Sequence, residues 1–383
     1  MKKTAAVVLI MAFCALRGFA LREDVAAVAD GVTLPLASQS ACLMEAETGD
    51  VLYEMNADEH LEPASVTKVM SMLLICEALD GGTLSLDDVV TASSYAAGMG
   101  GSQIWLETGE QMTVDEMLKA MAVVSANDCT VAMAEHLAGS EEIFTVRMNK
   151  RAAELGMVNT HFSNCTGLPV AEHYTTARDI AIMTRELLAH PVMQNYTTIW
   201  MDSLRGGAMG LTNTNKLIRF YPGANGMKTG YTDSAKYCLS ATAKRDGMQL
   251  IGVVMKAPSS DTRFADAKKL LDYGFANFAV NKPDVPEMPA LRVKGGVRPF
   301  VALAAKPAPV VVAKGREKLL EAQIYLPEAV SAPVEAGTPV GRIVYTLEGA
   351  PVKEIAVTAA EDVKRMGFGD LIKKIARTTA ILA

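Results

Sequence analysis

One short segment of the sequence contains the residue types that nucleophilic chemistry requires. EPASVTKVMSMLLICEAL begins at Glu62 and places Ser65 at the expected start of a helix, with Lys68 one turn later on the same face. A hydroxyl becomes a strong nucleophile when a base takes its proton, and a lysine is a base only when burial or a nearby cation lowers its pKa. The helix N-terminus would offer N–H groups to a developing oxyanion. The simpler interpretation is that Ser65 caps a helix and Lys68 is solvated.

Two further motifs help to decide between these interpretations. VVSANDCTVAMAEHL places Ser125 and Asn127 at the start of an apolar helix. GMKTGYT places Lys228, Thr229 and Gly230 at the beginning of the C-terminal strands. Alone, each has an ordinary structural explanation, because serine caps helices and glycine forms turns. In the order S-x-x-K, S-x-N, K-T-G they are far less expected by chance, and they predict that the serine of the first motif is a nucleophile.

Other chemistries fit the sequence less well. No G-x-S-x-G segment occurs, which weakens the interpretation as a Ser-His-Asp hydrolase. The net charge of −6 gives no global attraction to nucleic acid. The cysteines beyond the N-terminal segment form no C-x-x-C pair and no ligand-spaced cluster with the histidines. We therefore expect buried free thiols, no metal site and no cofactor.

The elements that must position the motifs change character along the chain. Residues 40–58 predict a β-hairpin, since two apolar runs flank a turn. Apolar residues then recur at helical spacing over residues 65–188, with a glycine-rich loop expected at residues 95–103. Residues 237–257 predict a second hairpin, followed by a helix. Strands at both ends with helices between them predict an α+β fold, in which helices cover one antiparallel sheet.

Composition divides the chain into segments of different kinds. Residues 1–20 combine two lysines, an apolar core and small residues at the end, the pattern of a secretory signal. Residues 21–280 form the expected catalytic domain, and the proline-rich segment 281–290 reads as a linker. Short β-rich runs broken by Gly and Pro over residues 291–358 predict a small all-β domain.

Residues 361–383 predict a C-terminal amphipathic helix. Its apolar stripe includes Phe368, Leu371, Ile372 and Leu382, and lysines and arginines lie mostly elsewhere on the helix. A basic amphipathic helix binds anionic membrane surfaces, so we expect this one to act as a membrane anchor. The alternative is a helix that docks on its own protein.

Taken together, these features resemble the low-molecular-mass penicillin-binding proteins that are D-alanyl-D-alanine carboxypeptidases. The likeness rests on the three motifs and also on NCTGLP at residues 164–169 and TTARDIAIMTRELLAHP at residues 175–191. It covers nearly everything from the signal to the terminal helix. It implies a β-lactamase/transpeptidase-like catalytic domain with a helical subdomain. It also implies a peptidoglycan stem peptide ending in D-Ala-D-Ala as substrate, acylation by β-lactam antibiotics, and action outside the cytoplasmic membrane, in the periplasm or cell wall.

The resemblance further implies roles for individual residues in catalysis. Ser65 would attack the carbonyl between the two D-alanines, and Lys68 would take the hydroxyl proton. Ser125 would relay a proton to the leaving amine. Asn127 would bind the substrate amide and hold Lys68, while Lys228 would keep Lys68 neutral by its positive charge.

The remaining positions implied by the resemblance bind substrate. Thr229, with Arg263 as a weaker candidate, would receive the free carboxylate, and Gly230 would let the substrate backbone approach the strand. The backbone N–H groups of Ser65 and Tyr231 would form the oxyanion hole. Tyr231 departs from the family, because some relatives carry histidine at this position.

Three alternative functions remain open at this point. A class A serine β-lactamase would need a glutamate after the second motif, and residues 160–166 read THFSNCT instead. A cross-linking transpeptidase usually has a large N-terminal extension and a membrane span. A catalytically weak cell-wall-binding protein would have lost a motif residue, and none is lost. We therefore favour the carboxypeptidase.

Overall fold

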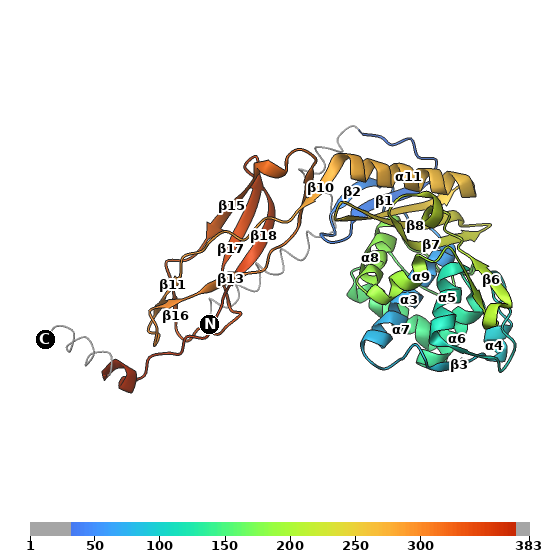
Figure 1. The fold of residues 1–383 in the computed structure, drawn as a ribbon, viewed down its shortest axis with the longest axis horizontal. Helices are drawn as coiled ribbons and strands as arrows, with labels where there is room; N and C mark the ends of the chain where they lie inside the picture. The colour runs from blue at the N-terminus through green and yellow to red at the C-terminus, as the bar shows by residue number, and fades with distance from the viewer. Residues whose placement is uncertain (1–31, 373–383) are drawn as a thin grey trace. The chain divides into compact units, whose positions relative to one another are not determined.

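A computed structural model describes residues 32–372 (Figure 1). These residues form two compact units, and the boundary between them in the sequence lies between Asn277 and Phe278. The predicted secretory signal lies outside the described residues. The expected domain boundary at residue 280 needs a correction, because Phe278 is buried and begins a strand of the second unit.

The first unit is built on a five-stranded antiparallel sheet with the order β2-β1-β9-β8-β7. Two ends of the unit meet in it, since the first hairpin pairs with the last strand, and β7 forms one edge. The strand β1 is buried at every position because α8 and α11 pack on the sheet (Figure 1). The strands are β1 (Ser40–Glu45), β2 (Val51–Met55), β7 (Ala224–Thr232), β8 (Lys236–Arg245) and β9 (Met248–Ala257).

Helices are the main regular structure between β2 and β7, and α11 follows β9. The central helix α3 is buried along most of its length, which fits its apolar sequence. The helix α5 begins with a capping box, in which the side chains of Thr113 and Glu116 each accept a hydrogen bond from the backbone N–H of the other. The helices are η1 (Ala64–Thr67), α3 (Lys68–Asp80), α4 (Ser94–Ala97), α5 (Val114–Val123), α6 (Asn127–Ala138), α7 (Glu141–Glu154), α8 (Ala177–Leu188), η2 (Pro191–Met193), α9 (Gln194–Thr197), η3 (Arg205–Gly207), α10 (Leu217–Phe220) and α11 (Ser260–Asn277).

Two short two-stranded sheets complete the first unit. One pairs β3 (Val89–Thr91) with β4 (Gln111–Thr113), and the other pairs β5 (Met201–Leu204) with β6 (Met209–Thr212). The loop expected at residues 95–103 is correct from residue 98 onward. Its start is helical, because the Ser93 side chain accepts a hydrogen bond from Ala96 N and caps α4.

The second unit is β-rich, as expected, so the α+β fold class followed by a small β domain is confirmed. Its sheets have the orders β13-β18-β17-β15, β12-β11-β16 and β10-β14. The elements are β10 (Phe278–Asn281), β11 (Leu291–Lys294), β12 (Phe300–Val301), β13 (Leu303–Ala305), β14 (Val310–Ala313), η4 (Glu317–Leu319), β15 (Leu320–Tyr325), β16 (Ala329–Ser331), β17 (Pro339–Leu347) and β18 (Ala350–Ala359).

The predicted C-terminal helix begins later than expected. Residues 361–367 are not helical, and Val363 is buried in the second unit, where it pairs with Val334. A helix starts at Phe368 and continues to Ile372, and residues 373–383 lie outside the described part. Within residues 32–372, no helix combines the length and the apolar character needed to cross a membrane.

Candidate active site

The backbone around Ser65 is packed tightly against the edge strand β7. Ser65 lies in the one-turn helix η1 rather than in α3, and Lys68 is the first residue of α3. A Cβ at Gly230 would lie 2.8 Å from Pro63 O and 3.0 Å from Ser65 N. Only glycine therefore allows the K-T-G strand to approach the nucleophile this closely.

Lys68 is fully buried and lies at the centre of the site. Its Nζ donates to Asn127 Oδ1 at 2.5 Å and to the Thr166 carbonyl at 2.8 Å, and it lies 3.0 Å from Ser65 Oγ. Burial lowers the pKa of Lys68 to about 7. A neutral amine has two N–H groups, which match the two carbonyl acceptors. Its lone pair is then free for the Ser65 hydroxyl proton.

Lys228 and Thr229 lie side by side on β7 and are both buried. Lys228 Nζ donates to Thr229 O at 2.8 Å, and the Thr229 and Thr214 hydroxyls are 2.7 Å apart. Burial lowers the pKa of Lys228 well below its usual value, and the charges of Lys68 and Arg263 lower it further. Burial is also the main cause of the lowered pKa of Lys68. Desolvation therefore already favours the neutral form of Lys68, which we had expected the charge of Lys228 to enforce.

Arg263 approaches β7 from α11 and is buried there. Its Nη1 donates to Gly230 O at 3.0 Å, and the guanidinium lies over Phe264, 4.8 Å from the ring centroid. Burial lowers the pKa of Arg263 to about 10. The arginine therefore fixes the carbonyl of the K-T-G glycine. Tyr231, the next residue, directs its side chain away: it is 48% exposed, and its hydroxyl donates to Asp233.

The S-x-N motif presents two side chains that differ in their bonding. Asn127 holds Lys68 through Oδ1, while its Nδ2 donates to Gly100 O at 2.7 Å. Ser125 is buried with a φ of 67°, and within residues 32–372 its Oγ has no hydrogen-bond partner. A non-glycine residue in this left-handed region is strained. The orphan hydroxyl is thus available to a substrate.

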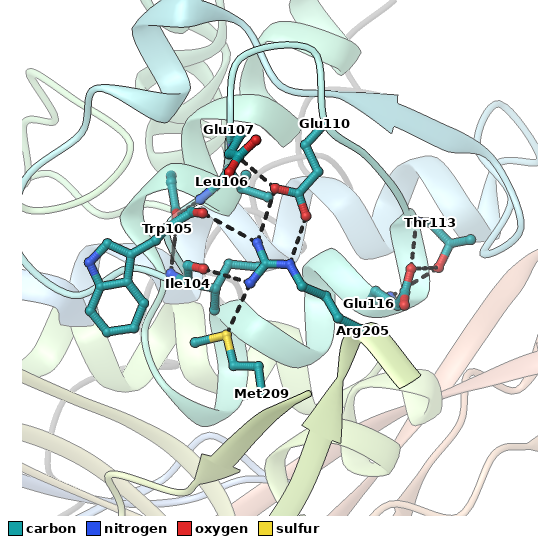
Figure 2. Close-up of polar contacts among 10 residues, drawn as sticks. Ile104, Trp105, Leu106, Glu107, Glu110, Thr113, Glu116, Arg205 and Met209 are labelled. Atoms are coloured by element: carbon teal, nitrogen blue, oxygen red, sulfur yellow. Dashed lines mark hydrogen bonds and ion pairs between the residues drawn. The ribbon is translucent and has the colours of Figure 1, made fainter. Parts of the chain in front are cut away.

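Asp128 was not singled out from the sequence, yet it fixes the loop beside Asn127. Its fully buried carboxylate accepts hydrogen bonds from Ile104 N at 3.0 Å and Leu106 N at 3.1 Å. On the other side, Arg205 Nη1 donates to Ile104 O at 2.9 Å, and its Nε lies 2.8 Å from Glu110 Oε1 (Figure 2). The backbone of the loop at residues 104–110 is therefore held by hydrogen bonds to two side chains, Asp128 and Arg205.

The NCTGLP segment contributes a backbone group that sequence reasoning also missed. Asn164 Oδ1 accepts hydrogen bonds from Thr166 N and Gly167 N, at 3.1 and 2.7 Å, and closes a tight turn. Gly167 has a φ of 84°, and a Cβ there would lie 1.8 Å from Ala64 O. This contact brings the Thr166 carbonyl to Lys68. The asparagine and glycine were a usable turn signal, but nothing in the sequence assigned the turn to the nucleophile.

The expected site residues thus fall into two groups. Hydrogen bonds join Ser65, Lys68 and Asn127 directly, and β7 carries the K-T-G residues along the edge next to them. Between residues 32 and 372, no group of acidic, histidine and cysteine side chains could hold a metal ion. The five cysteines of this part are all free and buried, namely Cys42, Cys76, Cys129, Cys165 and Cys238.

A helix-covered antiparallel sheet with an S-x-x-K serine on the helical side and K-T-G on the edge strand defines a serine enzyme of the penicillin-binding class. The chain matches the family described as D-alanyl-D-alanine carboxypeptidase over residues 26–259, and the C-terminal domain of penicillin-binding protein 5 over residues 289–365. The chain therefore belongs to the D-alanyl-D-alanine carboxypeptidase family.

Individual relatives agree with this assignment. The chain is 44% identical over 344 residues to D-alanyl-D-alanine carboxypeptidase DacF of Bacillus subtilis (strain 168), covering 88% of each chain. Penicillin-binding protein 5 from Haemophilus influenzae is similar in structure, with a TM-score of 0.81 and 32% identity over 88% of this chain and 100% of that one. Penicillin-Binding Protein D2 from Listeria monocytogenes, solved in an ampicillin-bound form, has a TM-score of 0.59 and 32% identity, covering 64% of this chain and 100% of that chain.

Proposed function

We propose that this carboxypeptidase removes the terminal D-alanine from peptidoglycan stem peptides ending in D-Ala-D-Ala, by way of an acyl-enzyme on Ser65. Membership of the family supports the reaction. One observation supports the residue: Lys68 Nζ lies 3.0 Å from Ser65 Oγ in a buried site that lowers the lysine pKa to about 7. A base with a pKa near neutrality is well matched to proton transfer under physiological conditions.

In the acylation step, Ser65 Oγ attacks the carbonyl carbon between the two D-alanines while its proton passes to Lys68 Nζ. The C–N bond then breaks, and the leaving nitrogen receives a proton from Lys68 through the Ser125 hydroxyl. Ser125 Oγ is buried and has no hydrogen-bond partner among the described residues, so its hydroxyl is free to turn toward Lys68 and the leaving nitrogen when substrate binds. The products are an ester on Ser65 and free D-alanine.

Deacylation reuses the same groups. Water attacks the ester carbonyl carbon and gives a proton to Lys68, and the Ser65 oxygen leaves and takes that proton back. In both steps the backbone N–H groups of Ser65 and Tyr231 stabilise the oxyanion. The products are a shortened peptide with a new carboxylate and the free enzyme.

Substrate orientation depends on the β7 edge. Thr229 binds the free carboxylate, and Lys228 with Arg263 supplies positive potential behind it. Because Arg263 already donates to Gly230 O, it acts mainly by its charge and by holding the strand. Gly230 leaves the edge open to the substrate backbone, and Asn127 binds the substrate amide from the opposite side.

The assignment of Ser65 is tested by intact mass after incubation with penicillin, followed over time. We expect one adduct on the wild-type protein and none on Ser65→Ala, which also stops D-alanine release. Ser94→Ala changes an exposed serine of α4 and should keep both activities. Labelling of the Ser65→Ala protein would reject the nucleophile. Rapid loss of the adduct, with turnover of the drug, would favour a β-lactamase instead.

The exposed start of the C-terminal helix supports a second proposal, that this segment binds the anionic membrane surface from outside the cytoplasm. Phe368, Leu371 and Ile372 are all exposed, and lysines and arginines flank them in the sequence. Each basic residue near such a surface adds roughly 1 kcal/mol to binding. The substrate of the proposed reaction is a cell-wall peptide, which places the anchored enzyme near its substrate.

The cut that tests the anchor must fall after Gly367, because Val363 is buried in the second unit. We expect the truncated protein to release D-alanine from a small peptide at the wild-type rate. Full-length protein should sediment with anionic vesicles at low salt and less at high salt. The truncated protein and the double variant Leu371→Ser with Ile372→Ser should stay in solution. Equal sedimentation of all three would reject the anchor and leave the alternative of a helix that docks on its own protein.

A further inference from the structure

His173 is a buried histidine that the proposed mechanism does not use. It precedes α8, and its ring is almost inaccessible to solvent. Its Nδ1 accepts a hydrogen bond from Ser163 N at 3.0 Å, so that nitrogen carries no proton. Burial lowers the pKa of His173 to about 4. The ring is therefore neutral near pH 7, with its one proton on Nε2.

The protonated Nε2 faces the segment that carries the nucleophile. It lies 2.8 Å from the hydroxyl of Thr67, the residue before Lys68. The Thr67 hydroxyl in turn donates to Ala64 O at 2.8 Å. Each group in this buried chain has one proton to give, so the direction is fixed: the imidazole N–H donates to Thr67, and Thr67 donates to the Ala64 carbonyl.

The Ala64 carbonyl belongs to the same peptide unit as the Ser65 N–H. A peptide unit is planar and trans, so its C=O and N–H point in opposite directions, and fixing one fixes the other. Ala64 has a φ of 48°, which is strained for a residue with a Cβ. The surrounding structure must therefore hold this peptide in place, and Gly167 packs directly against the same carbonyl oxygen.

We infer that His173 and Thr67 are positioning residues, which orient the Ala64–Ser65 peptide so that the Ser65 N–H points at the oxyanion of the reaction. The inference rests on the proposed function, because it takes Ser65 as the nucleophile and its N–H as an oxyanion donor. Neither side chain needs to touch the substrate. Both act through one backbone amide.

The chain offers a matched pair of variants for this test. Thr67→Val keeps the shape and removes the hydroxyl, whereas Thr67→Ser keeps the hydroxyl. The measurements are the second-order rate of acylation by penicillin and the infrared band of the acyl-enzyme carbonyl, made with a drug labelled with ¹³C at that carbon. Hydrogen bonds in the oxyanion hole lower the frequency of this band, so it reports on orientation rather than on folding.

Loss of one oxyanion donor typically costs about 10²–10³-fold, and misorientation should cost less. We expect Thr67→Val to acylate roughly 10–100-fold more slowly, with the carbonyl band at higher frequency. Thr67→Ser should remain near wild type in both measurements. His173→Phe, which leaves the Thr67 hydroxyl free to bond Ala64 O, should show a smaller change in the same direction.

Wild-type rate and band position in Thr67→Val would overturn the inference. So would equal losses in Thr67→Val and Thr67→Ser, since only packing would then matter. If Thr67→Val does not fold, the result with His173→Phe decides. An unshifted carbonyl band in that variant rejects the role of the hydrogen bonds from His173 through Thr67 to Ala64 O. Penicillin labelling of wild-type Ser65 tests the proposed function separately. Failure of the Thr67 and His173 variants to respond leaves that function standing, whereas failure of the labelling removes the basis of the inference.

Discussion

The two units of this protein differ in what they bury. The first unit buries ionisable side chains at and near the site, including Lys68, Lys228, Arg263 and Asp128. In the second unit, among residues up to 372, the polar side chain that is buried is Thr346, and the rest of its core is apolar with Tyr345. Burying charge costs folding free energy unless hydrogen bonds or function compensate. The comparison indicates that the first unit accepts this cost for chemistry, whereas the second is built for stability.

The largest effect that would sharpen this contrast is expected at Lys68. Lys68→Ala removes the base from Ser65, and loss of a general base typically lowers rates about 10²–10⁴-fold. Acylation by penicillin and D-alanine release should both fall by about this factor. Lys150→Ala changes an exposed lysine of α7 and serves as the control. Near-normal acylation in Lys68→Ala would show that this buried amine is not there for catalysis.

A pH profile follows from the same lysine. The pKa of Lys68 lies near 7, far below the usual value of a lysine, because the side chain is buried. Below that pH the amine is protonated and cannot act as a base. We expect the acylation rate to fall about tenfold per pH unit below pH ~7 and to level off above it. A flat rate between about pH 5.5 and 8 would contradict the assignment.

A smaller effect, on stability, is expected at Asp128. Asp128→Ala leaves the N–H groups of Ile104 and Leu106 without their buried acceptor, which should lower the free energy of unfolding by about 1–3 kcal/mol. Urea denaturation measures the change. The second unit provides the contrast: Arg342→Ala breaks a solvent-exposed ion pair with Glu354 and should cost about 0–1 kcal/mol. Equal losses would remove the distinction between the two units.

The smallest effect concerns the core of the second unit. The Tyr345 hydroxyl is buried and has no hydrogen-bond partner within the described residues. Tyr345→Phe removes a polar atom that folding must desolvate, so it should leave stability unchanged or raise it by up to about 1 kcal/mol. D-alanine release should not change. A clear loss of stability by thermal unfolding would show that this unit, too, depends on a buried polar contact.

The sequence by itself predicted most of the fold and named the candidate reacting residues. Hydrophobic periodicity separated helices from strands, and S-x-x-K, S-x-N and K-T-G depend on residue type at fixed spacing. Such signals are local, so they can be read without a structure. Ser65, Lys68 and Asn127 indeed prove to be joined by hydrogen bonds.

The tertiary structure decided what depends on distant segments or on backbone atoms. Every residue has a backbone carbonyl, so no sequence pattern could identify the carbonyl of Thr166 as a hydrogen-bond partner of Lys68. His173 reaches Thr67 only because the fold brings together parts of the chain that are far apart in sequence. At the C-terminus, a helix was expected from residue 361, but Val363 forms an isolated β-bridge with Val334, because burying it in the β-rich core is worth more than local helix formation.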